Sequence, residues 1–483
     1  MAGALTQPKP PADAPDRAVK IALLAASGVT LLFLVGAMVR ENFLSPWRYH
    51  QRQYRAKLLG SDDEKQRQLG RSFDVRIRQI DLPQLGRSDR CVSCHVALDN
   101  PAMAGAKQPY RPHSGDVLKH HPVEKYGCTV CHQGQGRATT FLEAKASGVH
   151  WDYPMLPANM TQASCGLCHA ADSPLIAKHA PVLALGRRLF VDRGCQACHK
   201  LDGVGGQLGP ALDGEGLKTR HQLPMGHVDG ERTVVNWLKQ HFDQPQKVVA
   251  GSQMRPPRLT PAENVALTTY MLSLQRRDLP ETYIAPDRIA SLDQSLHHKE
   301  VRGEALYNRF CVQCHGEGSY GTWDPFFHKF MPAVRGSGLR SVADPDYLKS
   351  AIEQGRPGTL MPAWGKSGGG LTAAQVASLV DYLTGPVAKD SKPVPSEQRR
   401  GDARRGAELF GQLCAGCHGK NQLAPSLGNA AFQSTATDEF ITRTIRGGRP
   451  DTAMPAFQRD GADGLSGDEI LDLVAHVRSL GKK

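Results

Sequence analysis

The sequence predicts a mainly α-helical protein with one N-terminal transmembrane helix, a loop-rich segment and three small α-helical domains. Three observations support this fold class. An uncharged apolar stretch lies near the N-terminus, a short cysteine string occurs six times, and one sequence unit repeats three times after residue 180. Such repetition indicates several small units rather than one large hydrophobic core.

The apolar stretch runs from Ile21 to Val39 and contains no charged residue. At a rise of about 1.5 Å per residue it is just long enough to cross a hydrocarbon core of about 30 Å. A cleaved signal peptide would have a shorter apolar region followed by small residues. Here residues 40–42 are Arg, Glu and Asn. We therefore expect an uncleaved membrane anchor.

All 12 cysteines of the chain belong to one pattern, Cys-x-x-Cys-His. A zinc site needs paired cysteine motifs or added histidines at suitable spacing, and a disulfide framework would not confine its cysteines to this string. The pattern instead predicts six covalently bound haem c groups. The strings are Cys91, Cys94 and His95; Cys128, Cys131 and His132; Cys165, Cys168 and His169; Cys195, Cys198 and His199; Cys311, Cys314 and His315; and Cys414, Cys417 and His418.

The spacing follows from the chemistry of haem attachment. Two thiols form thioethers with the two vinyl groups of one haem, and the adjacent histidine becomes the proximal ligand of the iron. The net charge of +12 would by itself suggest an anionic partner such as nucleic acid. Two propionates on each of six haems add roughly twelve carboxylates and offset that excess, so no nucleic-acid partner is expected.

Haem attachment also predicts the orientation in the membrane. Basic residues lie on both sides of the apolar stretch, so their distribution does not settle the topology. Because c-type haem is attached outside the cytoplasm, the bulk of the chain is expected on the periplasmic side of a bacterial inner membrane, held by a single span.

The repeated unit opens with a short helix that contains an aromatic residue and leads into a haem motif. It then has a proline, a methionine followed closely by proline, and a closing amphipathic helix that begins at a Ser or Thr cap. The opening glycines are Gly186, Gly303 and Gly406; the first prolines are Pro210, Pro332 and Pro425; and the caps are Thr260, Thr372 and Ser466.

These units resemble the small monohaem class I cytochrome c fold, three times over. The resemblance implies that each iron is held by the motif histidine and a distal methionine. The implied pairs are His199 with Met254, His315 with Met361, and His418 with Met454. Met225 and Met331 are the competing methionines, and Met254 is the weakest choice because Arg255 separates it from the proline.

Residues 88–180 differ, because three haem motifs lie close together and histidines are dense around them. Crowded haem domains usually take a second histidine as the distal ligand, and we expect His113, His121 and His150 in that role. His120 and His179 are the other histidine candidates, and Met103, Met155 and Met160 are less favoured.

The string His-Pro-Val-Glu-Lys-Tyr-Gly-Cys-Thr-Val-Cys-His-Gln-Gly-Gln-Gly covers residues 121–136. Together with the two flanking haem motifs and the anchor, it resembles anchored multihaem cytochromes that accompany bacterial quinol-oxidising, cytochrome bc-like complexes. The resemblance spans about residues 20–170 and implies a partner of that type.

The predicted organisation follows from these features. It comprises a cytoplasmic tail (1–20), a transmembrane anchor (21–39), a polar neck (40–87), a triheme bis-His domain (88–180) and three monohaem cytochrome c domains (181–275, 303–385 and 406–483). Residues 276–302 and 386–405 are expected to be linkers.

The predicted function is electron transfer, with no catalytic residue in this chain. Six-coordinate irons leave no open position for a substrate. We expect a hexahaem subunit that relays electrons from a membrane quinol-oxidising complex to a periplasmic or membrane acceptor, in contact with other cytochromes and the lipid bilayer. One alternative is the cytochrome c subunit of a terminal oxidase or reductase. Another is a multihaem reductase or peroxidase, if one haem has an open distal site.

Overall fold

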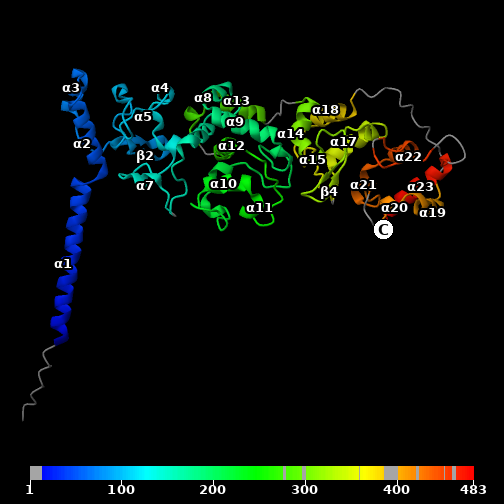
Figure 1. Ribbon diagram of the computed structural model, residues 1–483, viewed down its shortest axis with the longest axis horizontal. Coiled ribbons are helices and arrows are strands. Elements are labelled where there is room, and N and C mark those ends of the chain that lie inside the picture. The colour runs from blue at the N-terminus through cyan, green and yellow to red at the C-terminus, as the bar shows by residue number, and fades with distance from the viewer. Residues whose placement is uncertain are drawn as a thin grey trace, which may run out of the picture. The chain divides into compact units, whose positions relative to one another are not determined.

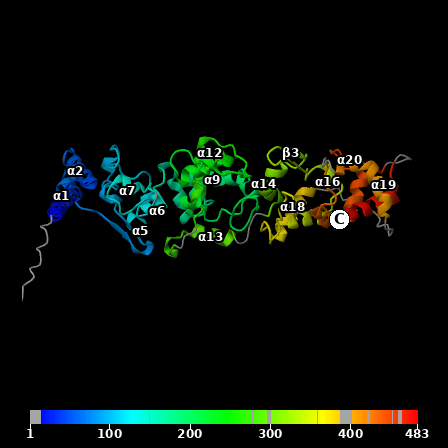
Figure 2. The same ribbon diagram turned by 90° about the horizontal axis from the view of Figure 1, so that it is seen from below.

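The computed structural model describes residues 14–148, 150–275, 279–295, 301–357, 359–385, 401–419, 424–450, 452–458 and 464–482. It is mainly helical, as predicted, and the strands among these residues form two short antiparallel hairpins (Figures 1 and 2). The chain divides into two compact units, Met1–Pro157 and Ala158–Lys483.

The first unit begins with helix α1 (Ala14–Phe43), which contains the predicted anchor. It is the one helix in the described part of the chain that is long and apolar enough to cross a membrane. Its apolar side chains are open to the surroundings: Leu24 is 73% exposed and Phe33 is 76% exposed. No protein core covers these side chains, which is the arrangement expected of a helix surrounded by lipid.

The predicted neck is helical and partly buried. Helices α2 (Pro46–Leu59) and α3 (Glu64–Ser72) pack against each other. The side chains of Tyr54 and Leu58 on α2 are buried against Ala97, just after the first haem motif. Helix α2 is therefore part of the first haem-binding region and not only a solvated spacer.

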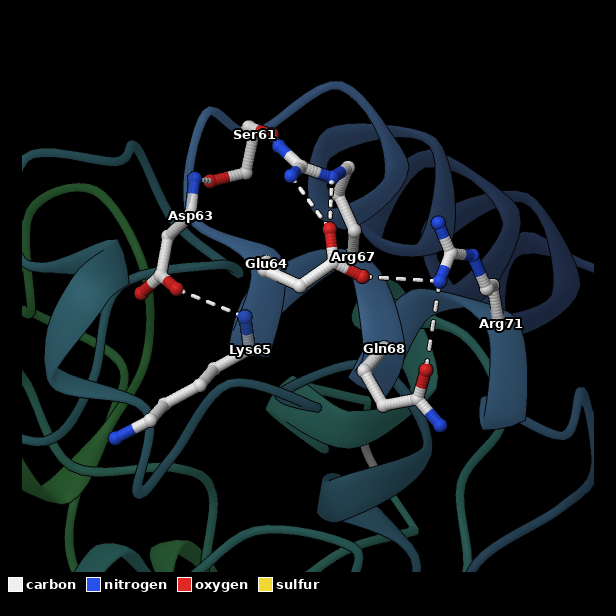
Figure 3. Close-up of polar contacts among 7 residues, drawn as sticks. All are labelled: Ser61, Asp63, Glu64, Lys65, Arg67, Gln68 and Arg71. Atoms are coloured by element: carbon white, nitrogen blue, oxygen red, sulfur yellow. Dashed lines mark hydrogen bonds and ion pairs between the residues drawn. The ribbon is translucent and has the colours of Figure 1, made fainter.

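Helix α3 begins with a capping interaction and a small ion-pair network (Figure 3). The Asp63 carboxylate accepts a hydrogen bond from the backbone N–H of Lys65 at 2.8 Å. Glu64, one residue later, pairs with both Arg67 and Arg71. Exposed ion pairs of this kind contribute little to stability. The start of the helix is therefore stabilised mainly by the Asp63 cap and by the packing of α3 on α2.

The remaining elements of the first unit are short and surround the first two haem motifs. Strands β1 (Ile80–Leu82) and β2 (Arg87–Asp89) form a hairpin in which Asp81 lies opposite Ser88. The other elements are η1 (Pro83–Leu85), η2 (Cys91–Ser93), η3 (Pro101–Met103), α4 (Val117–His120), α5 (Val123–Tyr126), α6 (Thr129–His132) and α7 (Phe141–Lys145).

The second unit contains the three repeated domains, each built on a crossing of its first and last helices. The crossing pairs are α9 (Pro181–Asp192) with α12 (Pro261–Ser273), α14 (Gly303–Phe310) with α18 (Ala373–Thr384), and α19 (Ala403–Leu413) with α23 (Gly467–Leu480). The predicted caps are confirmed: Thr260, Thr372 and Ser466 each form a capping box at the start of the last helix.

The repeated glycine lies at each crossing. A Cβ atom on Gly186, Gly303 or Gly406 would come within 1.9 to 2.0 Å of a backbone carbonyl oxygen of the partner helix. Only glycine allows the two helices to approach this closely. This explains why the same residue opens all three units.

The other elements of the second unit precede or connect these helices. They are η4 (Ala158–Leu167), α8 (Pro174–His179), η5 (Cys195–Ala197), η6 (Glu215–Leu217), η7 (Arg220–Gln222), α10 (Val234–Asp243), α11 (Pro245–Val248), η8 (Glu281–Tyr283), α13 (Pro286–Ser295), α15 (Val312–His315), β3 (Thr322–Asp324), β4 (Lys329–Met331), α16 (Ser337–Arg340), α17 (Pro345–Gln354), α20 (Ala415–His418), α21 (Ala430–Thr435) and α22 (Asp438–Gly447).

The third haem motif lies in the second unit, so the segment 88–180 contributes to both units. Segment η4, which leads into this motif, packs closely on helix α12. At Gly166 the approach is so close that a Cβ atom would lie 2.8 Å from the backbone oxygen of Ser273. This packing joins the third motif to the first monohaem domain.

Part of the predicted linker 276–302 is also structured, because helix α13 covers residues 286–295. The predicted linker 386–405 lies largely outside the described residues, and its end forms the start of α19.

The second and third monohaem domains share one hydrophobic core. Tyr347 on α17 stacks on Phe440 on α22 with ring centroids 4.2 Å apart and an interplanar angle of 11°. The two rings hold equivalent places in their domains, since each lies in the first turn of the helix that precedes the methionine loop. The two domains therefore pack through equivalent faces.

The glycine at the helix crossing gives a stability prediction with a control on the same helix. Replacing Gly406 by Ala would force the backbones of α19 and α23 apart and destabilise the third domain by about 1–3 kcal/mol. Gly411, also on α19, is exposed, and a Cβ atom added there would meet no atom within 4 Å. Gly411→Ala should stabilise the helix by about 0.5–1 kcal/mol.

Calorimetry of the haem-loaded protein would compare the two variants. A change of 1 kcal/mol moves the unfolding midpoint of a domain of 60–100 residues by about 4–8 °C. The explanation fails if Gly406→Ala and Gly411→Ala shift the transition of this domain by the same amount.

Candidate haem sites

The three C-terminal motif histidines share one hydrogen-bond arrangement. In each domain the imidazole Nδ1 lies within hydrogen-bond distance of the carbonyl oxygen of the proline predicted from the repeat. The pairs are His199 with Pro210 at 2.8 Å, His315 with Pro332 at 3.1 Å, and His418 with Pro425 at 2.9 Å. A donating Nδ1–H fixes the tautomer and leaves Nε2 with a lone pair for a metal.

The three predicted distal methionines share a local turn. The backbone N–H of each methionine donates to the hydroxyl oxygen of a Ser or Thr two residues earlier. The pairs are Met254 with Ser252 at 3.2 Å, Met361 with Thr359 at 3.2 Å, and Met454 with Thr452 at 3.1 Å. Met254 therefore has the same local geometry as the other two, despite the arginine that follows it.

The competitor Met331 lies in a different setting. It is on strand β4 and only 6% exposed, and it directly precedes the proline that accepts the hydrogen bond from His315. It therefore lies beside the motif histidine of the second domain, and this placement favours the prediction of Met361 as the distal ligand.

The surroundings of two of the motif cysteines fit an apolar group. Burial raises the pKa of the Cys195 and Cys311 thiols to about 12. Among the described residues no three His, Cys, Asp or Glu side chains gather around a common point. Paired thiols, an adjacent histidine and low local polarity match the needs of a covalent haem.

In the first unit, the structure brings His113 opposite the second motif. The ring centroids of His113 and His132 are 6.3 Å apart with an interplanar angle of 70°. The two rings are close enough that His113 and His132 would both serve as ligands of one haem bound at this motif. Nδ1 of His113 lies 3.0 Å from the carbonyl oxygen of Ser114, which leaves Nε2 for the iron.

The first two motifs lie side by side. The thiols of Cys91 and Cys128 form a hydrogen bond with each other. The buried carboxylate of Asp89 joins the two motifs, because it accepts hydrogen bonds from the backbone N–H of Cys128 at 2.6 Å and from that of Thr129 at 2.9 Å. Haems attached at these two cysteines would be close neighbours.

The other two predicted distal histidines have different positions. His121 is half-buried, with Nδ1 3.1 Å from the carbonyl oxygen of Val117 and its ring edge-on to Tyr126. His150 is exposed in a turn. Their pairing with particular haems stays a prediction.

Two histidines that the sequence analysis did not select lie near motif histidines. His50, on α2, contacts the Tyr110 hydroxyl through Nδ1 at 3.1 Å. Burial and the proximity of His50 lower the pKa of His95, with burial the larger cause. The sequence places His50 in a polar neck, and only the packing of α2 brings it to the first motif.

His241, on α10, is the second of these. Its ring stacks on Trp237, four residues earlier, at 4.5 Å. Burial, with His199 and Lys218 nearby, lowers the pKa of His241 to about 4, so the imidazole is neutral. Its Nδ1 is buried and has no hydrogen-bond partner in the described structure. In the sequence, the four-residue spacing of Trp237 and His241 could have indicated that the two rings lie on the same face of one helix.

The third motif has a different proximal partner. His169 Nδ1 lies 3.2 Å from a carboxylate oxygen of Asp287, at the start of α13. The other carboxylate oxygen accepts a hydrogen bond from the backbone N–H of Ala170, also at 3.2 Å. Burial opposes ionisation of this carboxyl, but hydrogen bonds from Ser173 and His169 lower the pKa of Asp287 below its usual value.

The first and second monohaem domains meet beside their haem motifs. Arg309 on α14 donates through Nε to the side-chain oxygen of Gln196 at 2.7 Å. Arg255, next to Met254, donates to the carbonyl oxygen of Gln313 at 3.3 Å. Gln196 and Gln313 each lie between the two cysteines of a motif. The fourth and fifth haem motifs are therefore neighbours.

Comparisons with known proteins agree with this geometry. Residues 183–275 match the family model of cytochrome c. Residues 299–383 and 401–477 match the model described as cytochrome c oxidase, cbb3-type, subunit III. The three C-terminal domains are thus cytochrome c domains, which carry covalently bound haem c.

Curated relatives point in the same direction. The chain is 26% identical over 203 residues to the cbb3-type cytochrome c oxidase subunit FixP of Bradyrhizobium sp. strain ORS 278, covering 39% of this chain and 63% of the relative. It is 31% identical over 213 residues to a cbb3-type subunit CcoP of Rhodobacter capsulatus, covering 40% and 66%. The chain thus spans somewhat less than two thirds of the length of these two relatives. No solved structure was found to match it.

The position of His113 gives a prediction with a nearby control. His113→Ala should remove the distal ligand of the second haem and convert one low-spin ferric signal to a high-spin one in electron paramagnetic resonance. His120→Ala, on the exposed end of α4, should leave the spectrum unchanged. An unchanged low-spin spectrum in His113→Ala would exclude His113 as a ligand.

Proposed function

We propose that this membrane-anchored multihaem c-type cytochrome is an electron-transfer subunit of a terminal oxidase complex. The supporting observation is the match of its last two domains to the third subunit of cbb3-type cytochrome c oxidases. The relatives named above are subunits of such oxidases as well. Of the functions predicted from the sequence, this evidence favours the terminal-oxidase alternative.

The proposal of a quinol-oxidising donor rests on different residues. It depends on the resemblance of about residues 20–170 to anchored multihaem cytochromes, and the matched family models begin at residue 183. A relay from a quinol-oxidising complex is therefore a narrower proposal about the source of the electrons, and it is compatible with an oxidase as the acceptor.

In the proposed mechanism, the chain holds redox centres in fixed positions. Bound haem supplies a one-electron ferric–ferrous couple. His199, His315 and His418 are oriented by proline carbonyl groups, so that each offers Nε2 to the iron. Met254, Met361 and Met454, the predicted second ligands, would each supply a thioether sulfur. An iron held by two protein ligands would have no open position for a substrate, which favours electron transfer over chemistry on a substrate.

Contacts between domains support a continuous route in the second unit. The fourth and fifth motifs are neighbours through Arg309 and Arg255. The second and third monohaem domains share a core across the stacked rings of Tyr347 and Phe440. These contacts hold the domains against one another, as successive short electron transfers require.

The oxidase assignment is tested by purifying the tagged full-length protein from native membranes in mild detergent. We expect co-purification of a membrane-embedded haem protein and cyanide-sensitive oxygen uptake driven by a reducing dye. An untagged strain is the control. Recovery of quinol-oxidising subunits without any oxygen-consuming activity would instead support the relay as the main function.

The predicted distal ligands are tested at Met361. Met361→His should lower the potential of one haem and remove one sulfur-to-iron absorption band, because the thioether favours reduced iron. Met331→Leu, at the competing methionine, should change neither property. Both variants are compared by spectroelectrochemical titration of the full chain, with a pyridine haemochrome assay to verify six haems. Loss of the band in Met331→Leu would reverse the assignment.

A further inference from the structure

The proximal side of the third haem site differs from that of the three cytochrome c domains in charge. In the three cytochrome c domains, the acceptor for the histidine Nδ1–H is a neutral proline carbonyl group. At His169 the acceptor is the carboxylate of Asp287. Among these four described Nδ1 acceptors of motif histidines, Asp287 alone carries a charge.

The position of Asp287 is held by several contacts. The backbone N–H of Ala285 donates to the carbonyl oxygen of Cys168 at 3.0 Å, which attaches the start of α13 to the motif. Asp287 itself accepts hydrogen bonds from Ala170 and Ser173. The side chains of His169 and Asp287 are 16% and 26% exposed, so water screens their interaction only in part. The carboxylate is thus built into the motif rather than placed there by a loose surface contact.

We propose that Asp287 is a positioning residue that lowers the reduction potential of the haem bound at Cys165, Cys168 and His169. A carboxylate acceptor draws the Nδ1 proton and increases the negative charge on the imidazole ring. This favours the ferric iron, which carries one more positive charge than the ferrous iron. The proposal rests on the ligation of a haem by His169.

The consequence is a step in potential inside the second unit. The third motif packs on α12 of the first cytochrome c domain, whose motif histidine has a neutral acceptor. An electron at the third haem would therefore move energetically downhill toward the His199 site. Helix α13, which lies in the segment that the sequence predicts to be a linker, supplies the residue that sets this direction.

The test is Asp287→Asn in the full-length haem-loaded protein. Asparagine keeps the shape of the side chain and removes its charge. We expect the equilibrium constant for reduction of one haem to rise about tenfold, which is a shift of about 59 mV for a one-electron couple. The g-values of one ferric low-spin or high-spin species should change with it. Asp287→Glu, which keeps the charge, should restore the lower potential at least in part.

A matched control removes the same charge nearby. Asp172 lies three residues after His169 and forms a half-exposed ion pair with Arg187 at 2.9 Å. Asp172→Asn should shift no haem by a comparable amount. An equal shift in both variants, or no shift in Asp287→Asn, would overturn the proposal.

A variant with Cys165→Ala and Cys168→Ala tests separately whether the third motif binds a haem at all. Its result distinguishes an error about the role of Asp287 from an error about haem binding at this motif. It should lose one haem and the low-potential component that Asp287→Asn moves. If the haem count is unchanged, the third motif binds no haem and the function assigned to it fails. If a haem is lost but the component remains, only the role of Asp287 is excluded.

Discussion

The constraint on which this structure depends is the short length of the haem attachment string. Two cysteines and a histidine within five residues fix one edge and one face of a haem, but they do not orient the imidazole. The chain around each motif must therefore supply an acceptor for Nδ1 and a second ligand. In each C-terminal domain a proline carbonyl group meets the first need, and the predicted methionine would meet the second. Both arrangements recur with nearly the same distances.

This constraint also explains the helix crossings. A domain of about 80 residues has little apolar surface to bury, and a haem can supply much of what is missing. The first helix must then end at the motif while the last helix closes the domain, so the two have to cross closely. The repeated glycine, with its hydrogen atom directed at a carbonyl group of the partner helix, allows this approach in all three domains.

Much of this arrangement could be predicted from the sequence, because it depends on local patterns. The glycines, the prolines, the Ser or Thr caps and the methionines followed closely by proline recur at similar intervals, and each has a local physical reason. The apolar anchor follows from length and composition alone. The methionine beside Arg255 is the least certain of the set by its sequence, and its turn, with Ser252 two residues earlier, matches the others.

The features that sequence analysis missed depend on contacts between distant segments. His50 reaches the first motif only because α2 packs on this region through the buried side chains of Tyr54 and Leu58. The sequence around His50 suggested only a polar neck. The third motif joins the second unit through η4 and α12, although it is closer in sequence to the second motif.

Asp287 is the most distant of these cases, since it lies 118 residues after His169 in a segment without clear periodicity. No spacing rule connects a carboxylate to a motif so far away. The three neutral acceptors in the C-terminal domains show what is enough to orient a motif histidine. A charged acceptor exceeds that need, and it also has to be held by Ala170 and Ser173 in a partly buried place where an unpaired carboxylate would be costly. The extra contacts are best explained by an electrostatic effect on the iron, because a carbonyl group would have oriented the ring equally well.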